Sequence, residues 1–173
     1  EPDIIGDAVG EALARTGLVF ASGGLGPTVD DITRDALGLL LGRRIVLHRP
    51  SVETIAARYA ARGRTLTPAG ERQARVLEGC AVLPNSAGAA PGQRLDLPAG
   101  KVLFVLPGPP GEFNAILREH VLPWLRRRHA DARPSPVRIV RTRGIGESDI
   151  VTLLEEAGFQ PADGVALGFY PAR

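Results

Sequence analysis

Two adjacent carboxylates follow a glycine-rich stretch near the start of the sequence. The apolar run 18–21 is typical of a buried strand, and the segment Gly23–Thr28 holds too many glycines to be a helix or a strand. Asp30 and Asp31 come next, just before a predicted helix. Backbone N–H groups of such a loop and of a helix N-terminus attract anions, whereas carboxylates repel them. The order therefore predicts a phosphate site whose acids act through a divalent cation such as Mg²⁺.

The acids also have a simpler explanation. Asp30, Asp31 and Thr33 stand where side chains cap a helix and where negative charge is favourable. We expect one of the two acids to serve only in this way, and the pair as a whole to hold a metal or orient a ligand hydroxyl. The predicted phosphate contacts come from Gly23, Gly24, Gly26 and Thr28.

A second polar loop follows the predicted strand 81–83. Asn85 and Ser86 offer an amide and a hydroxyl, while Gly88 and Gly92 allow the chain to pass close to a neighbour. Turn formation explains these four residues equally well. Both interpretations remain open at this point.

A third loop starts at Pro107 and Gly108, where the chain turns into a helix N-terminus that suits an anion. Glu112 lies in the first turn of that helix. Its carboxylate either balances the helix dipole or contacts a metal or a ribose.

The elements around the loops indicate where the loops lie. Predicted strands at 18–22, 81–83 and 101–106 precede them, and strands alternate with helices up to residue 129. That alternation favours an α/β fold with a mostly parallel sheet sandwiched by helices. Loops at the carboxyl ends of such strands line one crevice, so we expect the three loops to form one site.

Periodicity, caps and chain breakers define the other elements of this part. We predict helices over 3–15, 33–41, 51–62, 67–76 and 111–128. Ser51 and Thr67 are the expected N-caps of the third and fourth of these, and the last should bend near Pro123. We also predict an extended connector at 45–47 and a hairpin that joins 95–97 to 101–106.

Composition changes after residue 129. The stretch 130–136 is rich in proline, alanine and charge and is typical of a linker. A strand over 137–142, a helix over 149–157 capped by Ser148, and a strand over 165–170 would make a small α+β subdomain. We therefore predict a main domain over 1–129 and a subdomain over 130–173.

Composition also excludes several classes of protein. Hydrophobic residues make up 44% of the chain and the net charge is +2, so a folded core is expected and a nucleic-acid partner is not. Cys80 is the single cysteine, which rules out a disulfide framework within the chain. The three histidines have no metal-ligand spacing. Without a long apolar stretch or a signal peptide, we expect a cytoplasmic protein with no membrane partner.

Five motifs are similar to those of one family. GGLGPTVDDITRDAL at 23–37 resembles the GGLGPTxDDxT signature of CinA-type proteins, also called competence/damage-inducible protein A. LPNSAGAAPG at 83–92 resembles their LPNxxGTAPG, and LPGPPGEF at 106–113 resembles LPGxPxEM. GIGES at 144–148 and the pair Tyr170-Pro171 fit the small domain that follows in that family.

The resemblance implies a molybdenum-cofactor-biosynthesis-like domain, the three-layer molybdopterin-binding fold shared with MogA, MoaB and MoeA, followed by a KH-like subdomain. It also implies metal-dependent hydrolysis of ADP-ribose and related nucleotide diphosphates, with a homo-oligomer as the expected assembly. By position, the resemblance implies a phosphate and metal loop formed by Gly23, Gly24, Gly26, Thr28, Asp30 and Asp31. It implies a pocket lined by Asn85, Gly88, Pro91 and Gly92, with Gly108 and Glu112 on the opposite side.

The chain departs from the family pattern in three places. The family's opening strand and its GDE-type loop are absent, so we expect an exposed sheet edge and an incomplete site. Ala89 stands where the family has a threonine, which removes a hydroxyl. The C-terminal nicotinamide-mononucleotide deamidase domain that many members carry is also absent.

The leading hypothesis is therefore an enzyme fragment in which Asp30 and Asp31 hold Mg²⁺ or a similar ion, and metal-bound water attacks a phosphorus of a pyrophosphate. A non-hydrolytic module that binds a pterin or a nucleotide is one alternative. Adenylylation of molybdopterin, as in MogA-like proteins, is another, and a purely oligomerising role is a third.

Overall fold

The computed structural model describes residues 2–131 and 137–170. The chain divides into two compact units, residues 1–131 and 132–173, and each is described by itself. The predicted linker 130–136 lies mostly outside the described residues, as does Pro171 of the Tyr170-Pro171 motif.

The first unit is built on a four-stranded sheet. Its strands are β1 (Leu18–Ser22), β6 (Val102–Leu106), β5 (Gly92–Asp96) and β4 (Ala81–Leu83), in the order β1-β6-β5-β4. Strands β1 and β6 are parallel, in the register Leu18 to Val102. Strand β5 is antiparallel to both β6 and β4. Within the described strands, β1 pairs only with β6 and is an edge strand of the sheet.

The α/β class with a helix-covered sheet is confirmed, but the expected parallel direction is found only between β1 and β6. The connections explain the difference. The 3₁₀ turn Pro98–Gly100 (η2) joins β5 to β6 as the hairpin that the sequence predicts, and only residues 84–91 join β4 to β5. A parallel pair requires a crossover of about a dozen residues or more, which neither connection provides.

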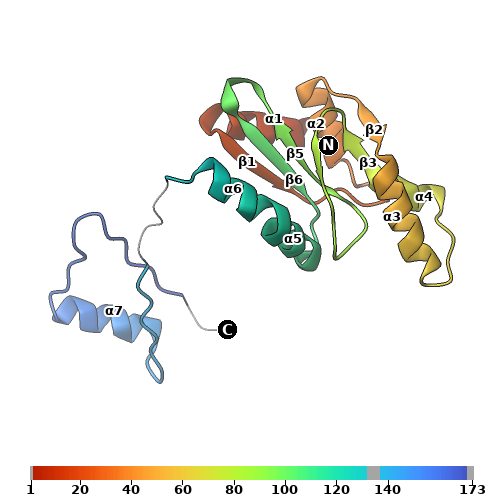
Figure 1. The fold of residues 1–173 in the computed structure, drawn as a ribbon. Helices are drawn as coiled ribbons and strands as arrows, with labels where there is room; N and C mark the ends of the chain where they lie inside the picture. Colours follow the sequence, from red (N-terminus) through yellow and green to blue (C-terminus); the bar gives the residue numbers. More distant parts are fainter. Residues whose placement is uncertain (1, 132–136, 171–173) are drawn as a thin grey trace. The chain divides into compact units, whose positions relative to one another are not determined.

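Helices cover both faces of the sheet (Figure 1). Helices α1 (Pro2–Arg15) and α2 (Thr33–Leu41) pack against one face, and α5 (Pro110–Ile116) and α6 (Leu122–Arg128) pack against the other. The alternation of side chains along β6 divides the core accordingly. Leu103 and Val105 belong to the cluster with α1 and α2, whereas Val102, Phe104 and Leu106 belong to the cluster with α5 and α6.

The helices of these layers end and bend where the sequence indicates. Helix α2 stops at Gly42, whose φ of 60° is in the left-handed region that glycine adopts readily. The predicted helix 111–128 contains a π-helical turn, Leu117–Val121 (η3), just before Pro123. Because proline has no N–H to donate, the regular hydrogen-bond pattern cannot continue through that point.

A hairpin and two helices form a layer beside the sheet. The hairpin consists of β2 (Ile45–Leu47) and β3 (Arg75–Leu77). Between these strands the chain forms α3 (Arg49–Ala60), α4 (Pro68–Glu71) and the 3₁₀ turn Arg72–Ala74 (η1), which leads into β3. Thr67 caps α4, as predicted, by accepting a hydrogen bond from the Gly70 N–H.

Three predictions for this layer are corrected. The segment 45–47 is a paired strand rather than a connector, and the predicted helix 67–76 gives way to β3 at Arg75. The pairing of Val46 with Val76 accounts for both changes, because it draws each segment into an extended conformation. Helix α3 starts after His48, and Ser51 lies inside it, because Pro50 fits the first helical turn.

In the second unit, the regular element is helix α7 (Glu147–Glu156). Its N-cap is Gly146, not Ser148. The strands predicted at 137–142 and 165–170 are not formed in the described residues. An isolated strand leaves its backbone groups unpaired, and the two segments do not pair with each other. Across the described residues, no helix is both long and apolar enough to span a membrane.

Candidate functional site

The three predicted loops leave the same edge of the sheet. Strands β1 and β6 are parallel, and β4 runs in their direction because both β4 and β6 are antiparallel to β5. The carboxyl ends of these three strands therefore point to one edge. The loop after β6 lies between the other two, as the strand order requires.

The first and third loops touch each other directly. The Ser22 hydroxyl donates to the Pro107 carbonyl at 3.2 Å, and the Gly23 N–H donates to the Leu106 carbonyl at 2.9 Å. A Cβ on Gly108 would lie 3.3 Å from the Cα of Gly23. Gly108 thus lies where two backbones approach closely, and little space is left between them for a ligand.

The start of the first loop depends on glycine. Gly23 and Gly24 have φ values of 98° and 67°, in the region that glycine adopts at little cost. A Cβ on Gly24 would collide with the Thr33 hydroxyl. These glycines turn the chain from β1 towards α2, which is the turn that the sequence predicts.

Asp31 folds back onto its own loop. Its Oδ2 accepts hydrogen bonds from the Thr28 N–H at 2.9 Å and the Thr28 hydroxyl at 2.6 Å. Burial raises its pKa, but the hydrogen bonds from Thr28 and Gly26, together with the charge of Arg34, outweigh burial and lower the pKa below its usual value. A Cβ on Gly26 would collide with this carboxylate. Asp31 therefore stays ionised and closes the loop, whereas Asp30 is exposed.

A hollow of about 340 Å³ lies beside this loop, and we call it the arginine hollow. Arg34 is 5% exposed, and its guanidinium donates to the Gly26 carbonyl at 3.0 Å and the Arg75 carbonyl at 3.4 Å. Arg72 donates to the Pro27 carbonyl at 2.8 Å. The lining consists of Gly26, Thr28, Val29, Asp31, Arg34, Asp35, Ile45, Arg72 and Arg75.

The charge of the arginine hollow is unusual. Within the part of the chain that the structure describes, none of Arg34, Arg72 and Arg75 forms an ion pair with a carboxylate. Burial lowers the pKa of Arg34, against the opposing effect of Asp31 and Asp35. Arginine is charged in proteins even so. The hollow therefore presents a buried cation without a contacting counter-charge, a feature that sequence reasoning missed.

The donor set does not fit a resident metal. Among residues 2–131 and 137–170 there is no group of three or more His, Cys, Asp or Glu side chains that could hold an ion. Asp31 already accepts several hydrogen bonds within its loop, and Asp30 is exposed. The described part of the chain thus offers no cage of its own for a divalent cation.

Asn85 organises the second loop from within. It is 7% exposed, and its amide oxygen accepts from the N–H groups of Ala87 at 3.1 Å and Gly88 at 2.8 Å. Its amide nitrogen donates to the Ala90 carbonyl at 2.8 Å and to Glu112 Oε2 at 2.6 Å. Asn85 thus makes the turn that was one of its two predicted roles, and it also joins the loop to α5.

The glycines of this loop serve packing. A Cβ on Gly88 would collide with the Glu112 carboxylate, and one on Gly92 would lie 3.0 Å from Leu106 and 3.1 Å from Ile116. Neither glycine lines the arginine hollow or the larger cleft described next. Their predicted ligand contacts, and that of Glu112, stay predictions.

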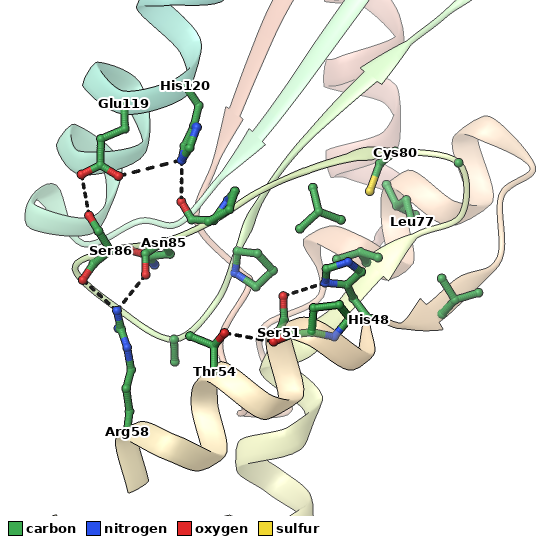
Figure 2. Close-up of a pocket in the computed structure, with 18 residues that line it drawn as sticks. His48, Ser51, Thr54, Arg58, Leu77, Cys80, Asn85, Ser86, Glu119 and His120 are labelled. Carbon is green, nitrogen blue, oxygen red and sulfur yellow. Dashed lines mark hydrogen bonds and ion pairs between the residues drawn. The ribbon is translucent and has the colours of Figure 1, made fainter. Parts of the chain in front are cut away.

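A larger cleft of about 780 Å³ opens on the other side of the second loop, between α3, the β2–β3 hairpin and η3 (Figure 2). Asn85 and Pro91 are the predicted site residues that line it. His48 and His120 line it too, although their spacing in the sequence predicts no metal site. His48 Nδ1 lies 2.8 Å from the Ser51 hydroxyl, and His120 Nε2 lies 3.0 Å from the Pro84 carbonyl.

The predicted site residues therefore lie along one edge of the sheet, which borders two separate spaces, the arginine hollow and the larger cleft. Gly26, Thr28 and Asp31 line the arginine hollow, and Asn85 and Pro91 line the cleft. The structure does not gather the remaining predicted residues, Gly23, Gly24, Asp30, Gly88, Gly92, Gly108 and Glu112, around either space. Arg34, Arg72 and Arg75 could not be found from sequence because three separate segments supply the lining.

Comparisons with known proteins agree with this architecture. A family model described as a probable molybdopterin binding domain matches residues 1–127. A CinA-like protein of Chlorobaculum tepidum is 39% identical over 175 residues, which cover 99% of this chain and 41% of that protein. A putative competence-damage inducible protein of Symbiobacterium thermophilum is 41% identical over 148 residues, covering 84% of this chain and 34% of the relative.

One solved structure is similar as well. The crystal structure of the protein CinA from Thermoplasma acidophilum, described as of unknown function, aligns with a TM-score of 0.63 and 32% identity over 71% of each chain. The present chain spans about two fifths of the length of the Chlorobaculum relative.

Proposed function

The chain belongs to the family of probable molybdopterin-binding domains and is similar to CinA-like proteins, and on that premise we propose that it binds a phosphate-bearing nucleotide or pterin. The observation that carries this proposal is Arg34, a buried guanidinium beside the glycine-rich loop that has no ion-pair partner in the described residues. Asp31 and Asp35 act on this charge without forming an ion pair with it, and a buried charge that lacks a contacting partner is costly. An anion in the arginine hollow would supply that contact.

The balance of the other groups supports the same ligand. Arg72 and Arg75 add two cations to the hollow, against the carboxylates of Asp31 and Asp35. Donors of its own loop already surround the Asp31 carboxylate, so it repels an incoming phosphate less than a bare acid would. Arginine, with its planar set of donors, is well suited to phosphate oxygens. The phosphate therefore contacts protein cations directly.

Beyond binding, the specific reaction that we propose is the hydrolysis of a nucleotide diphosphate such as ADP-ribose by the complete protein. The motif that contains Asp30 and Asp31, and the position of Asp31 in the lining of the hollow, support it. Asp31 is ionised near neutral pH, as an ordinary aspartate is, and its lowered pKa reinforces this, so its part is to hold the loop closed rather than to donate a proton. Residues 2–131 and 137–170 form no cage for a divalent ion, so we propose that an ion taking part in the reaction is bound together with the substrate's phosphates.

Calorimetric titration of the complete protein with ADP-ribose, followed by an assay for released nucleotide and ribose phosphate, separates binding from turnover. We expect Asp30→Asn to abolish turnover with affinity changed by less than about threefold. Asp7→Asn, at an exposed position that lines neither the hollow nor the cleft, should change neither. Normal turnover by both Asp30→Asn and Asp31→Asn would refute the hydrolytic role. Absence of binding would refute the proposal as a whole.

The same assay separates the alternatives. ADP-ribose that binds without product identifies a non-hydrolytic module, which the inward-facing bonds of Asp31 would favour. Release of pyrophosphate that depends on ATP and molybdopterin identifies adenylyl transfer. The homo-oligomer and the cytoplasmic location expected from the sequence belong to the same proposal and are checked by light scattering and fractionation.

A further inference from the structure

We propose that the Asp31 carboxylate occupies an anion site in the first loop, and that a phosphate group of the ligand binds there by displacing it. This inference rests on the proposed function, because it gives the phosphate a second set of contacts beside the arginines. The site, which we call the loop anion site, consists of the N–H groups of Gly26 and Thr28 and the hydroxyl of Thr28.

The donors of the loop anion site converge on one carboxylate. Asp31 Oδ2 accepts from the Thr28 N–H at 2.9 Å and from the Thr28 hydroxyl at 2.6 Å, and the Gly26 N–H also donates to this carboxylate. Converging backbone N–H groups of this kind are what phosphate-binding loops offer to a phosphate oxygen. A Cβ on Gly26 would collide with the carboxylate, so glycine leaves room for it. The loop is therefore shaped around an anion, and the chain's own side chain supplies that anion.

The loop anion site adjoins the buried cation of the arginine hollow. Gly26, Thr28 and Asp31 line the hollow together with Arg34, whose guanidinium donates to the Gly26 carbonyl at 3.0 Å. In the described residues, neither Arg34 nor Asp31 forms an ion pair. A phosphate carries several acceptor oxygens, so one group can contact the loop donors and an arginine together. The Asp31 carboxylate, which is attached to the loop, contacts only the loop.

The carboxylate can leave these donors without a change in the fold. Asp31 is half-buried and Thr28 is exposed, so both are within reach of a ligand in the hollow. Among residues 2–131 and 137–170, no side chain outside this loop donates a hydrogen bond to the Asp31 carboxylate. Its departure therefore breaks bonds within the loop alone.

The attachment of Asp31 to the loop makes it a strong competitor, because a tethered group is present at a high effective concentration. Phosphate binds to the loop donors only in the fraction of molecules in which Asp31 has left them, and that fraction reduces the apparent affinity. Removal of the carboxylate should therefore strengthen phosphate binding. A carboxylate that served the ligand through a metal would have the opposite effect on removal.

The test is a calorimetric titration of inorganic phosphate, in the presence of EDTA, into the complete protein and its variants. Asp31→Ala empties the loop anion site. Asp35→Ala is the matched control, because Asp35 also lines the hollow and acts on Arg34 but accepts no bond from Thr28. We expect Asp31→Ala to bind phosphate about tenfold or more tightly than the parent, and Asp35→Ala to gain less than about threefold.

Asp31→Asn loses the charge but keeps an acceptor oxygen, so its gain should lie between those of the two alanine variants. Equal gains in Asp31→Ala and Asp35→Ala, or weaker binding by Asp31→Ala, would overturn the inference. Absence of phosphate binding in the parent and in every variant would refute the proposed function. Binding that is not strengthened in Asp31→Ala would refute only the displacement.

Urea unfolding with and without sodium acetate gives a second measurement, which does not depend on phosphate. Asp31→Ala leaves the Thr28 donors without their acceptor, so we expect a lower unfolding midpoint than in the parent. Acetate carries the same carboxylate and should restore most of that difference, while it leaves the midpoints of the parent and Asp35→Ala unchanged. The same shift with acetate in all three proteins, or no shift in Asp31→Ala, would contradict the loop anion site.

Discussion

The Asn85 amide donates to Glu112 Oε2 at 2.6 Å, and this bond joins the loop after β4 to the first turn of α5. The two residues come from motifs more than twenty positions apart, and for each the sequence predicts a ligand contact as one of two roles. In the structure they bind each other. Much of the polar chemistry at this edge thus holds the loops together.

Replacement of Asn85 tests that conclusion. Asn85→Ala removes four hydrogen bonds, one of them to a carboxylate, and leaves loop N–H groups without partners. We expect the free energy of unfolding to fall by about 2–4 kcal/mol in urea titrations. Ser86→Ala, which removes one exposed bond to Glu119, should cost less than about 1 kcal/mol. Equal costs would show that Asn85 does not organise the loop.

Alanine substitutions at Gly88 and Gly111 should change the free energy of unfolding in opposite directions. A Cβ at Gly88 would collide with Glu112, so Gly88→Ala should lower the free energy of unfolding by about 1–3 kcal/mol. Gly111 has nothing within 4 Å of its Cβ position and lies in α5, so Gly111→Ala should stabilise by up to about 1 kcal/mol. In a Glu112→Ala background the Gly88→Ala cost should shrink. An undiminished cost there would contradict the contact.

The pH dependence of stability follows from Asp31. Hydrogen bonds from Thr28 and Gly26 lower its pKa, so its contribution is fully present above the unfolded value of about 4. The contribution is lost as the pH falls through the lower folded-state pKa. The stability difference between the parent and Asp31→Asn should therefore be constant near neutral pH and shrink below ~pH 4, as chemical denaturation can measure. A difference that grows on acidification would contradict the assignment.

Cys80 should react slowly. Burial raises the pKa of its thiol to about 11, so only ~0.1% is thiolate near pH 8, against roughly a quarter of an ordinary free thiol. Alkylation by iodoacetamide, followed by mass spectrometry, should be at least about a hundredfold slower than that of glutathione. Comparable rates would show that the thiol is not shielded.

The sequence predicts much of the fold because local signals and tertiary packing agree there. The apolar run of β1, the glycines after it and the Gly42 stop of α2 specify those elements from a few neighbouring residues. The common edge of the loops follows from the direction of their strands. By contrast, the segments 45–47 and 75–77 are extended because they pair with each other, which no local pattern reveals.

The site was less predictable, for a physical reason. Glycine patterns show where the backbone turns, but not which way a side chain then points. The Asp31 carboxylate could face a ligand or its own loop, and it faces the loop because the N–H and hydroxyl of Thr28 donate to it. The arginine hollow needs Arg34 from α2 beside Arg72 and Arg75 from η1 and β3. That contact exists only after the hairpin layer has packed.

The most direct test of the central claim is the affinity for inorganic phosphate, measured by calorimetry with Arg75→Gln against Arg49→Gln. Both arginines are exposed, but only Arg75 lines the arginine hollow. We predict affinity at least tenfold weaker in Arg75→Gln, unchanged in Arg49→Gln and unchanged by EDTA, because the phosphate contacts arginine directly. Equal affinity in the two variants, or loss of binding on addition of EDTA, would contradict it.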